Sequence, residues 1–229
     1  MIPALAPASL QIAGHRMVGV STGYMSESYG NWPALLEQAT ATSTLAVELS
    51  ALSEPELPSL VDFLAEANAL PFLFVSVHAP AKDRELAEAD LVATLARLAD
   101  RADAIVVHPD TVADPSAYRE LGSSLVIENM DRRKVFGQTA EHLDRVFDAL
   151  PEAGLCFDVP HAASIDPTLA VAREILDRHG ARLRHVHLSS LDADCHHQTL
   201  TSEDKKLFAE LLDRCRDVPW ILEAPPAGR

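Results

Sequence analysis

The sequence has too few cysteines for a disulfide scaffold and too few basic residues for a protein that follows nucleic acid. Its three cysteines in 229 residues are an odd count with no CxxC pair, which indicates free thiols in a reducing cytoplasm. Against 34 aspartates and glutamates stand only 19 lysines and arginines, a formal net charge of −15. This balance disfavours nucleic acid and anionic membranes as partners, because phosphate binding needs a basic face.

Signatures of other protein classes are missing too. No apolar run reaches the ~18 residues that a membrane helix needs, and the N-terminus has no basic start followed by an apolar stretch, as a secretory signal would. The sequence contains no P-loop, no GxGxxG, no GxSxG and no cysteine-rich zinc module. The hydrophobic fraction of 48% is enough for a sizeable core. Because the membrane and secretion signals are missing, we expect a cytoplasmic protein with no membrane partner.

The chain alternates between short apolar runs and longer segments with helical periodicity. The eight apolar runs are rich in β-branched residues and almost uninterrupted, as strands of a buried parallel sheet are. They cover residues 15–21, 44–50, 72–78, 104–108, 124–129, 155–159, 183–189 and 219–224. The helical segments are expected over residues 32–40, 56–68, 84–101, 140–150, 167–178 and 202–216.

The alternation predicts a (β/α)8 TIM barrel. Most strand ends are about 30 residues apart, the length of one strand with its return helix, and strict alternation implies a parallel sheet with right-handed crossovers. An open doubly wound sheet is the alternative, but it normally needs a glycine-rich first turn, which Val20–Gly23 is not. No linker or low-complexity tract divides the chain, so we expect one domain over residues 1–229.

Seven of the eight predicted strands end in a side chain that can titrate or bind a metal. Barrel active sites lie at the carboxyl ends of the strands, and buried carboxylates and imidazoles are costly unless they are paired or bound to metal. A network of structural ion pairs is the alternative explanation. The strand-end residues are Ser21, Glu48, His78, His108, Glu128, Asp158, His187 and Glu223.

The order of the strand-end motifs resembles the xylose-isomerase-like TIM-barrel superfamily, which holds sugar isomerases and epimerases and the endonuclease-IV type of apurinic-site nuclease. No single motif is specific, but their order and placement together are. The motifs are Val77–Pro80 (VHAP), Val107–Asp110 (VHPD), Ile127–Asn129 (IEN), Asp158–His161 (DVPH), His185–His187 (HVH) and Leu222–Pro225 (LEAP).

The resemblance implies a divalent metal site. The implied ligands of one ion are Glu128, Asp158, His187 and Glu223, and His187 is preferred to His185 because it lies nearer the rim. Imidazole and carboxylate ligands without cysteine suit Mn²⁺, Zn²⁺, Co²⁺ or Fe²⁺. The endonuclease-type relatives imply ligands for a second or third ion, unless these residues only orient substrate: His78, His108, His161, Asp194 and His196, with His197 as a substitute for His196.

Two activities follow from the resemblance. The first is an isomerase or epimerase of a small sugar-like or phosphorylated compound, with Glu128 and Glu223 as base and acid and His161 holding a substrate oxygen. The second is a polynuclear hydrolase of a phosphoester, and we narrowly favour the first because of the charge and the size of the chain. A non-catalytic binding barrel is a third option. Substrate contacts are expected from Glu48 at the rim and from the basic run Arg132, Arg133 and Lys134, unless these are solvated surface residues.

The eighth outer helix is missing from the sequence. Only six residues follow Glu223, and they include two prolines and a glycine, which cannot form a helix. The last strand would therefore expose Trp220 and Leu222, and exposed apolar patches commonly mark interfaces. Either residues 2–12 fold back over this gap or a second copy of the chain covers it as a homodimer. We favour the dimer, because Pro3 and Pro7 make the first segment a poor helix.

Overall fold

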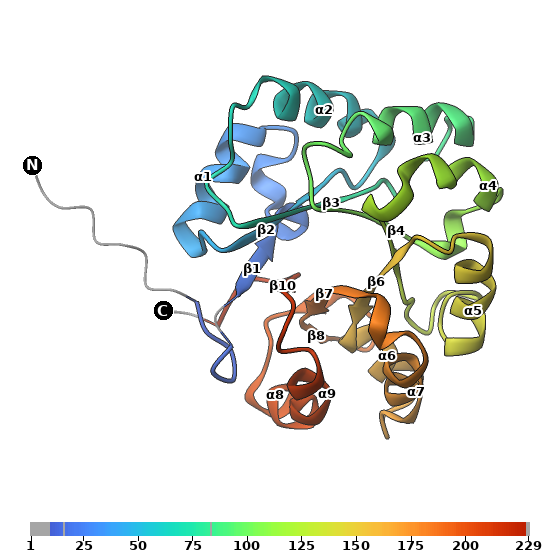
Figure 1. The fold of residues 1–229 in the computed structure, drawn as a ribbon. Coiled ribbons are helices and arrows are strands. Elements are labelled where there is room, and N and C mark those ends of the chain that lie inside the picture. The colour runs from blue at the N-terminus through green and yellow to red at the C-terminus, as the bar shows by residue number, and fades with distance from the viewer. Residues whose placement is uncertain (1–9, 16, 83, 228–229) are drawn as a thin grey trace, which may run out of the picture.

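A computed structural model describes residues 10–15, 17–82 and 84–227 of the chain. Eight parallel strands close into a barrel in the order β1-β10-β7-β6-β5-β4-β3-β2, with helices outside it (Figure 1). The predicted TIM-barrel fold is confirmed. The barrel strands are β1 Val18–Ser21, β2 Ala46–Ser50, β3 Phe74–His78, β4 Ala104–Val107, β5 Leu125–Glu128, β6 Gly154–Asp158, β7 Leu183–Leu188 and β10 Trp220–Leu222.

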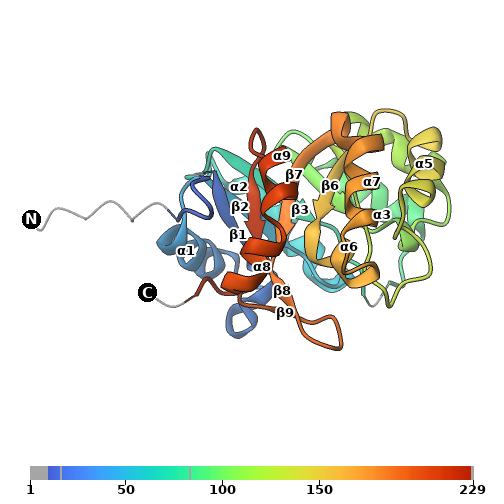
Figure 2. The same ribbon diagram turned by 90° about the horizontal axis from the view of Figure 1, so that it is seen from below.

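A layer of helices covers the barrel, and a small hairpin projects from one end of it (Figure 2). The hairpin pairs β8 Ser190–Leu191 with β9 His197–Gln198 in antiparallel fashion. The helices are α1 Trp32–Thr42, α2 Leu57–Glu66, α3 Glu88–Ala96, α4 Pro115–Tyr118, α5 Ala140–Ala149, α6 Val159–Ile165, α7 Ala170–His179, α8 Ser202–Leu207 and α9 Ala209–Arg214. Across the described part of the chain, no helix combines the length and the apolar character needed to cross a membrane.

The third helix is shorter than the sequence predicted. We expected it over residues 84–101, but it begins at Glu88. The carboxylate of Glu54 accepts the backbone N–H groups of Glu85 and Leu86 at 2.6 and 2.8 Å. These bonds hold the segment in a loop over the barrel, because a side-chain acceptor competes with the helical hydrogen-bond ladder.

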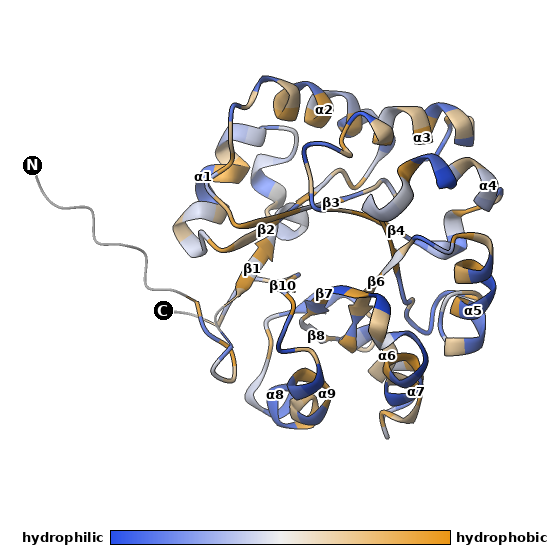
Figure 3. Cartoon of the chain, in the orientation of Figure 1, coloured by the Kyte–Doolittle hydropathy of each residue, from blue (hydrophilic) through white to orange (hydrophobic). Residues whose placement is uncertain are grey.

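The hydrophobic residues form two separate cores. The larger one fills the space between the strands and the helices, and Figure 3 shows apolar strands surrounded by helices that mix apolar and polar residues. The smaller core lies inside the barrel. Its buried members, with Phe74 packed against them, are Ala104, Val106, Val126 and Cys156. Inward-facing positions nearer the carboxyl ends of the strands carry polar side chains instead, so the barrel interior is apolar only in its lower part.

The last barrel strand, β10, is covered by the chain itself. In the described residues after β10 no helix forms, as predicted. The expected exposed patch is absent, however, because Trp220 is 0% and Leu222 is 3% exposed. His15 stacks on Trp220 at 4.2 Å between ring centroids, and Ile12 beside it is buried. The expectation of an uncovered apolar strand was therefore wrong, and residues 1–9 of the predicted cover lie outside the described part. The homodimer remains a prediction.

Candidate metal centre

The carboxyl ends of the barrel strands bring six of the predicted residues to one mouth of the barrel. Strands that all run parallel in a closed barrel end on the same side, and the pairing register places Asp158 beside His187. Each of the six side chains is buried or nearly so. They are His78 at the end of β3, His108 after β4, Glu128 at the end of β5, Asp158 at the end of β6, His187 on β7 and Glu223 after β10.

Four of these residues form a group that we call the central cluster: Glu128, Asp158, His187 and Glu223. Each offers one ligand atom, and these atoms all lie within 4.8 Å of one another. The Nδ1 atom of His187 is 3.3 Å from Glu223 Oε1 and 3.4 Å from Glu128 Oε1. The structure therefore brings together the four side chains that the resemblance implied as ligands of one ion.

The central cluster has the polar atoms that a cation would satisfy. Asp158 Oδ2, Glu223 Oε2 and His187 Nδ1 are buried and have no hydrogen-bond partner. Burial raises the pKa of Asp158 well above its ordinary value, and the nearby carboxylates of Glu223 and Glu128 raise it further, against the effect of His161. Crowded buried carboxylates repel one another unless a positive charge lies between them. The donor set therefore fits a divalent cation.

A second group, the lateral cluster, consists of His78, His108 and Glu128, whose ligand atoms also lie within 4.8 Å of one another. Glu128 Oε2 is 3.2 Å from His78 Nε2 and 3.3 Å from His108 Nε2. The two Nε2 atoms are 3.1 Å apart. Burial lowers the pKa of His108, so its ring is neutral at neutral pH and offers a lone pair.

Glu128 belongs to both clusters and is 1% exposed. Burial by itself would raise the pKa of its carboxyl, but His187 and His108 hold it well below the ordinary value. A carboxylate that stays ionised while buried among imidazoles is suited to bind metal. Its Oε1 atom faces His187 of the central cluster, and its Oε2 atom faces His78 and His108 of the lateral cluster. The two oxygens of Glu128 therefore contact different imidazoles.

His161 lies at the N-terminus of α6, where Asp158 Oδ1 accepts its backbone N–H at 2.6 Å. Burial would lower the pKa of the His161 ring, but the carboxylates of Asp158 and Glu128 raise it to about 10. Its Nδ1 is 3.2 Å from Glu128 Oε1 and 3.0 Å from the carbonyl oxygen of Asn129. Because Glu128 belongs to both clusters, His161 lies next to both of them. We predicted this histidine as a catalytic residue.

Asn129 and Asp131 lie near the site and carried no predicted role. The side-chain amide of Asn129 pairs with the backbone N–H and carbonyl of Asp158 at 2.9 and 2.8 Å and so fixes the end of β6. Asp131 binds the Arg133 guanidinium through both carboxylate oxygens. Their position directly after Glu128 was the available signal, but sequence spacing does not show which way a loop side chain turns.

Glu48 lies deeper than predicted. We expected it at the rim as a substrate contact, but its side chain is 0% exposed. Strand β2 continues to Ser50, which pairs in register with His78, whereas Glu48 pairs with Ser76. Ser50 therefore reaches the mouth and borders the cavity, and Glu48 stays one layer below it, where it cannot touch a substrate.

The basic run after β5 is largely engaged within the chain. Arg132 donates to the backbone carbonyl of Ala193 and does not border the cavity at the mouth. Arg133 pairs with Asp131, and Lys134 Nζ is 2.6 Å from Asp110 Oδ2. Arg133 and Lys134 do border the cavity, so they alone of the three are placed to meet a substrate.

At the start of β9, His197 rather than His196 lies beside the central cluster. His197 Nδ1 is 3.4 Å from Glu223 Oε2 and 2.9 Å from Ser189 Oγ. His196 is exposed and pairs with Asp192 at 3.3 Å. Asp194 is also exposed and belongs with these two residues to a separate surface group. The predicted pair Asp194 and His196 is therefore not joined to the central cluster, and the substitute His197 is.

A cavity of about 380 Å³ opens over both clusters. Polar side chains make up much of its wall, and Lys82, which had no predicted role, is among them. The charged and histidine side chains of the wall are His78, Lys82, His108, Glu128, Asp131, Arg133, Lys134, His161, His196, His197 and Glu223. The volume suits a small molecule, since ligand pockets commonly measure about 300–1,000 Å³.

Comparisons with solved structures show the same fold in several proteins. Endonuclease IV from Thermus thermophilus is 22% identical, with a TM-score of 0.56 over 92% of this chain and 93% of that chain. The 3-keto-D-glucoside 4-epimerase of E. coli is 14% identical, with a TM-score of 0.53 over 93% of each chain. A xylose isomerase-like TIM barrel protein from Mycobacterium smegmatis in complex with magnesium is 14% identical, with a TM-score of 0.53 over 85% of this chain and 82% of that chain.

Identities this low establish the fold and leave the activity open. No curated protein sequence matches the chain. A family model described as xylose isomerase-like TIM barrel matches residues 59–227, which contain all six of the residues gathered at the barrel mouth. This match covers well over half of the sequence and agrees with the closed parallel barrel. The chain therefore belongs to the xylose isomerase-like TIM-barrel family.

Proposed function

We propose that this protein is a metal-dependent hydrolase of a small phosphoester that uses two divalent ions. The position of Glu128 between two donor sets carries the proposal. Its Oε2 is 3.2 and 3.3 Å from the Nε2 atoms of His78 and His108, and its Oε1 is 3.4 Å from His187 Nδ1. A carboxylate in this position can bridge two ions, and pairs of ions about 3.5–4 Å apart are typical of phosphatases and nucleases.

Two bound ions would supply a clamp on the attacking and leaving oxygens of an in-line displacement at phosphorus. The residues of the chain hold the substrate around that point. Lys82, Arg133 and Lys134 border the cavity and favour an anionic group there. His161, whose pKa is about 10, carries a proton at neutral pH and presents its ring to the same cavity.

The ligand types limit the choice of metal ion, and the net charge and the cavity size limit the class of substrate. Imidazoles with carboxylates suit Mn²⁺, Zn²⁺, Co²⁺ or Fe²⁺. A net charge of −15 opposes a long nucleic acid, because its binding depends on a basic surface. The cavity of about 380 Å³ accepts a small phosphoester, which we take as the substrate class.

The test combines metal analysis with an activity assay. The protein is stripped with a chelator, reloaded with Mn²⁺, Zn²⁺ or Co²⁺, and assayed on p-nitrophenyl phosphate and bis(p-nitrophenyl) phosphate. We expect two exchangeable ions per chain at the mouth of the barrel, one of them in His108→Asn, and loss of both of these ions and of hydrolysis in Glu128→Gln. His142→Asn, a histidine outside both clusters, is the matched control. A fully loaded protein with one ion and no phosphoesterase activity would overturn the proposal.

An isomerase or epimerase is the second candidate, and the position of Glu223 favours it. This carboxylate borders the cavity, and its Oε2 accepts no hydrogen bond, so it could serve as an acid or base beside a carbonyl compound. The discriminating experiment incubates the metal-loaded protein with keto sugars in D₂O. Deuterium entering the carbon next to the carbonyl would support the isomerase, and its absence together with phosphoester cleavage would support the hydrolase.

A further inference from the structure

Below the mouth of the barrel lies a second polar group, the inner cluster: Glu48, Cys156, His185 and His187. All four side chains are 0% exposed. They lie inside the barrel below its mouth, and Cys156 also packs in the small apolar core beneath them. Cys156 pairs in register with His185, two residues below the pair Asp158 and His187. The inside of a TIM barrel is normally filled by bulky apolar residues, so this polar layer needs a chemical explanation.

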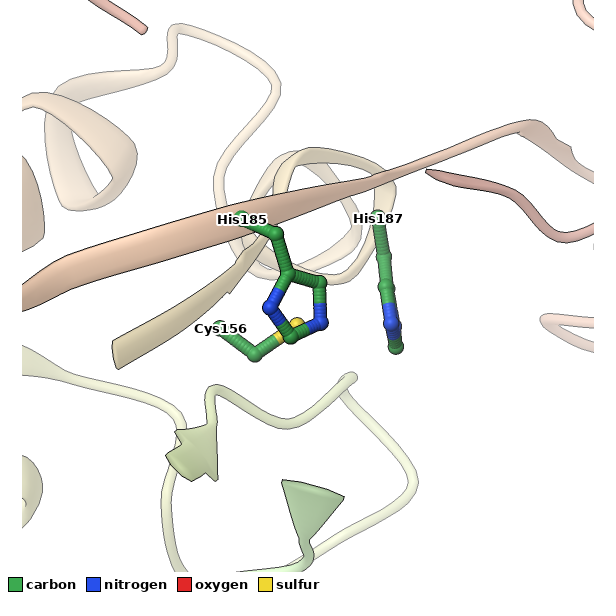
Figure 4. A group of neighbouring side chains, drawn as sticks. All are labelled: Cys156, His185 and His187. Carbon is green, nitrogen blue, oxygen red and sulfur yellow. The ribbon is translucent and has the colours of Figure 1, made fainter. Parts of the chain in front are cut away.

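The donor atoms of the inner cluster are spaced like the ligands of one ion. Ligand atoms of Cys156, His185 and His187 lie within 4.8 Å of one another, and Figure 4 shows both rings on β7 beside the sulfur from β6. Glu48 Oε2 is 2.9 Å from His187 Nε2 and 3.6 Å from His185 Nε2. Tetrahedral coordination with Zn-like bond lengths separates ligand atoms by about 3.3–3.6 Å.

Unpaired atoms point to a ligand at this place. Both ring nitrogens of His185 and Oε1 of Glu48 are buried without a hydrogen-bond partner, although a buried imidazole or carboxylate is costly when it stays unpaired. The Ser76 hydroxyl and the His187 ring satisfy only Oε2 of Glu48. Glu48 Oε2 lies 3.6 Å from His185 Nε2, which is beyond hydrogen-bond distance, so among the described residues the His185 ring has no hydrogen-bond partner.

We propose that Cys156, His185, His187 and Glu48 bind a Zn²⁺-like ion inside the barrel, beneath the mouth, in addition to the two clusters there and with His187 shared with the central cluster. One thiolate, two imidazoles and one carboxylate form a closed four-ligand set, which is typical of a structural site. Binding releases the thiol proton of Cys156. His187 joins this site through Nε2 and faces the central cluster through Nδ1, and if both nitrogens bind ions the ring also gives up its N–H proton.

Cobalt spectroscopy tests the inner site without reference to catalysis. Because its donors are fully buried, the chelator-treated chain is unfolded and refolded with Co²⁺, and the thiolate-to-cobalt charge-transfer band in the near ultraviolet is recorded. Of the three cysteines only Cys156 belongs to the cluster. We expect the band in the wild type and in Cys215→Ala and Cys195→Ala, its loss in Cys156→Ala, and a weaker band in His185→Gln.

Each outcome bears on the proposal. Circular dichroism shows whether the Cys156→Ala variant, a small change in a buried position, has folded. If it has not, the spectra of the wild type and of Cys195→Ala and Cys215→Ala still test the proposal. Absence of the band from refolded wild type would overturn the site and leave buried water as the partner of His185. A band lost in Cys195→Ala but kept in Cys156→Ala would overturn it too, since the thiolate would then lie in the β8–β9 loop. The band reports only sulfur ligation, so it is independent of phosphoesterase activity.

Discussion

Replacing Asp158 by asparagine should have opposite effects on stability with and without metal. The carboxyl group is fully buried, and burial together with Glu223 and Glu128 raises its pKa well above the ordinary value. An acid whose pKa is raised by folding stabilises the folded state at low pH relative to neutral pH. Stability is lost as the pH rises above the unfolded pKa of about 3.9. Near neutral pH the metal-free wild type therefore carries a penalty at this residue.

The substitution removes the charge and keeps the local structure. Asp158 Oδ1 accepts the backbone N–H of His161 at 2.6 Å and caps α6, and asparagine caps helices equally well. We expect the metal-free variant to gain about 1–2 kcal/mol near neutral pH, or roughly 2–8 °C in Tm for a chain of this size. The gain should shrink as the pH falls toward about 4.

Metal should reverse the order of stability. An ion at a hundredfold excess over its Kd stabilises the wild type by about 2.7 kcal/mol, and the variant, with one ligand impaired, should lose most of that gain. The assay is thermal unfolding followed by circular dichroism, in chelator and in Mn²⁺ or Zn²⁺. Asp114→Asn makes the same change at the N-cap of α4 and should respond to metal like the wild type. A metal-free Asp158→Asn protein that melts at or below the wild-type temperature would refute the reasoning.

Three further predictions concern stability. In Gly19→Ala the new Cβ would lie 2.2 Å from the Ala46 carbonyl oxygen, so we expect a loss of about 1–3 kcal/mol in urea denaturation, and an unchanged midpoint would contradict this contact. Glu54→Gln should cost about 1–3 kcal/mol. Because the pKa of Glu54 is lowered in the fold, that loss should fade below pH ~4.3, as a pH series of unfolding curves would show. Trp220→Phe removes the Nε1–H bond to the Cys215 carbonyl and should cost about 1 kcal/mol; a Tm equal to that of the wild type would argue against it.

The sequence by itself determined the barrel and most of the candidate metal ligands at its mouth. Eight apolar runs at regular intervals permit few other folds, because parallel strands need long crossovers. Residues at the ends of those runs, such as Glu128, Asp158 and Glu223, then have to meet at one rim. That argument uses only direction along the chain, and the structure places all three in the central cluster.

Only the tertiary structure decided how deep each side chain lies in the barrel, which partner it contacts and which way the loop residues point. Alternation shows that Glu48 faces inward, but the register between β2 and β3 puts Ser50 at the mouth and Glu48 beneath it. The fold likewise brings His197 beside Glu223 while His196 stays exposed, and it pairs Lys134 with Asp110. These features depend on contacts between segments far apart in sequence, whose geometry is set when the barrel closes.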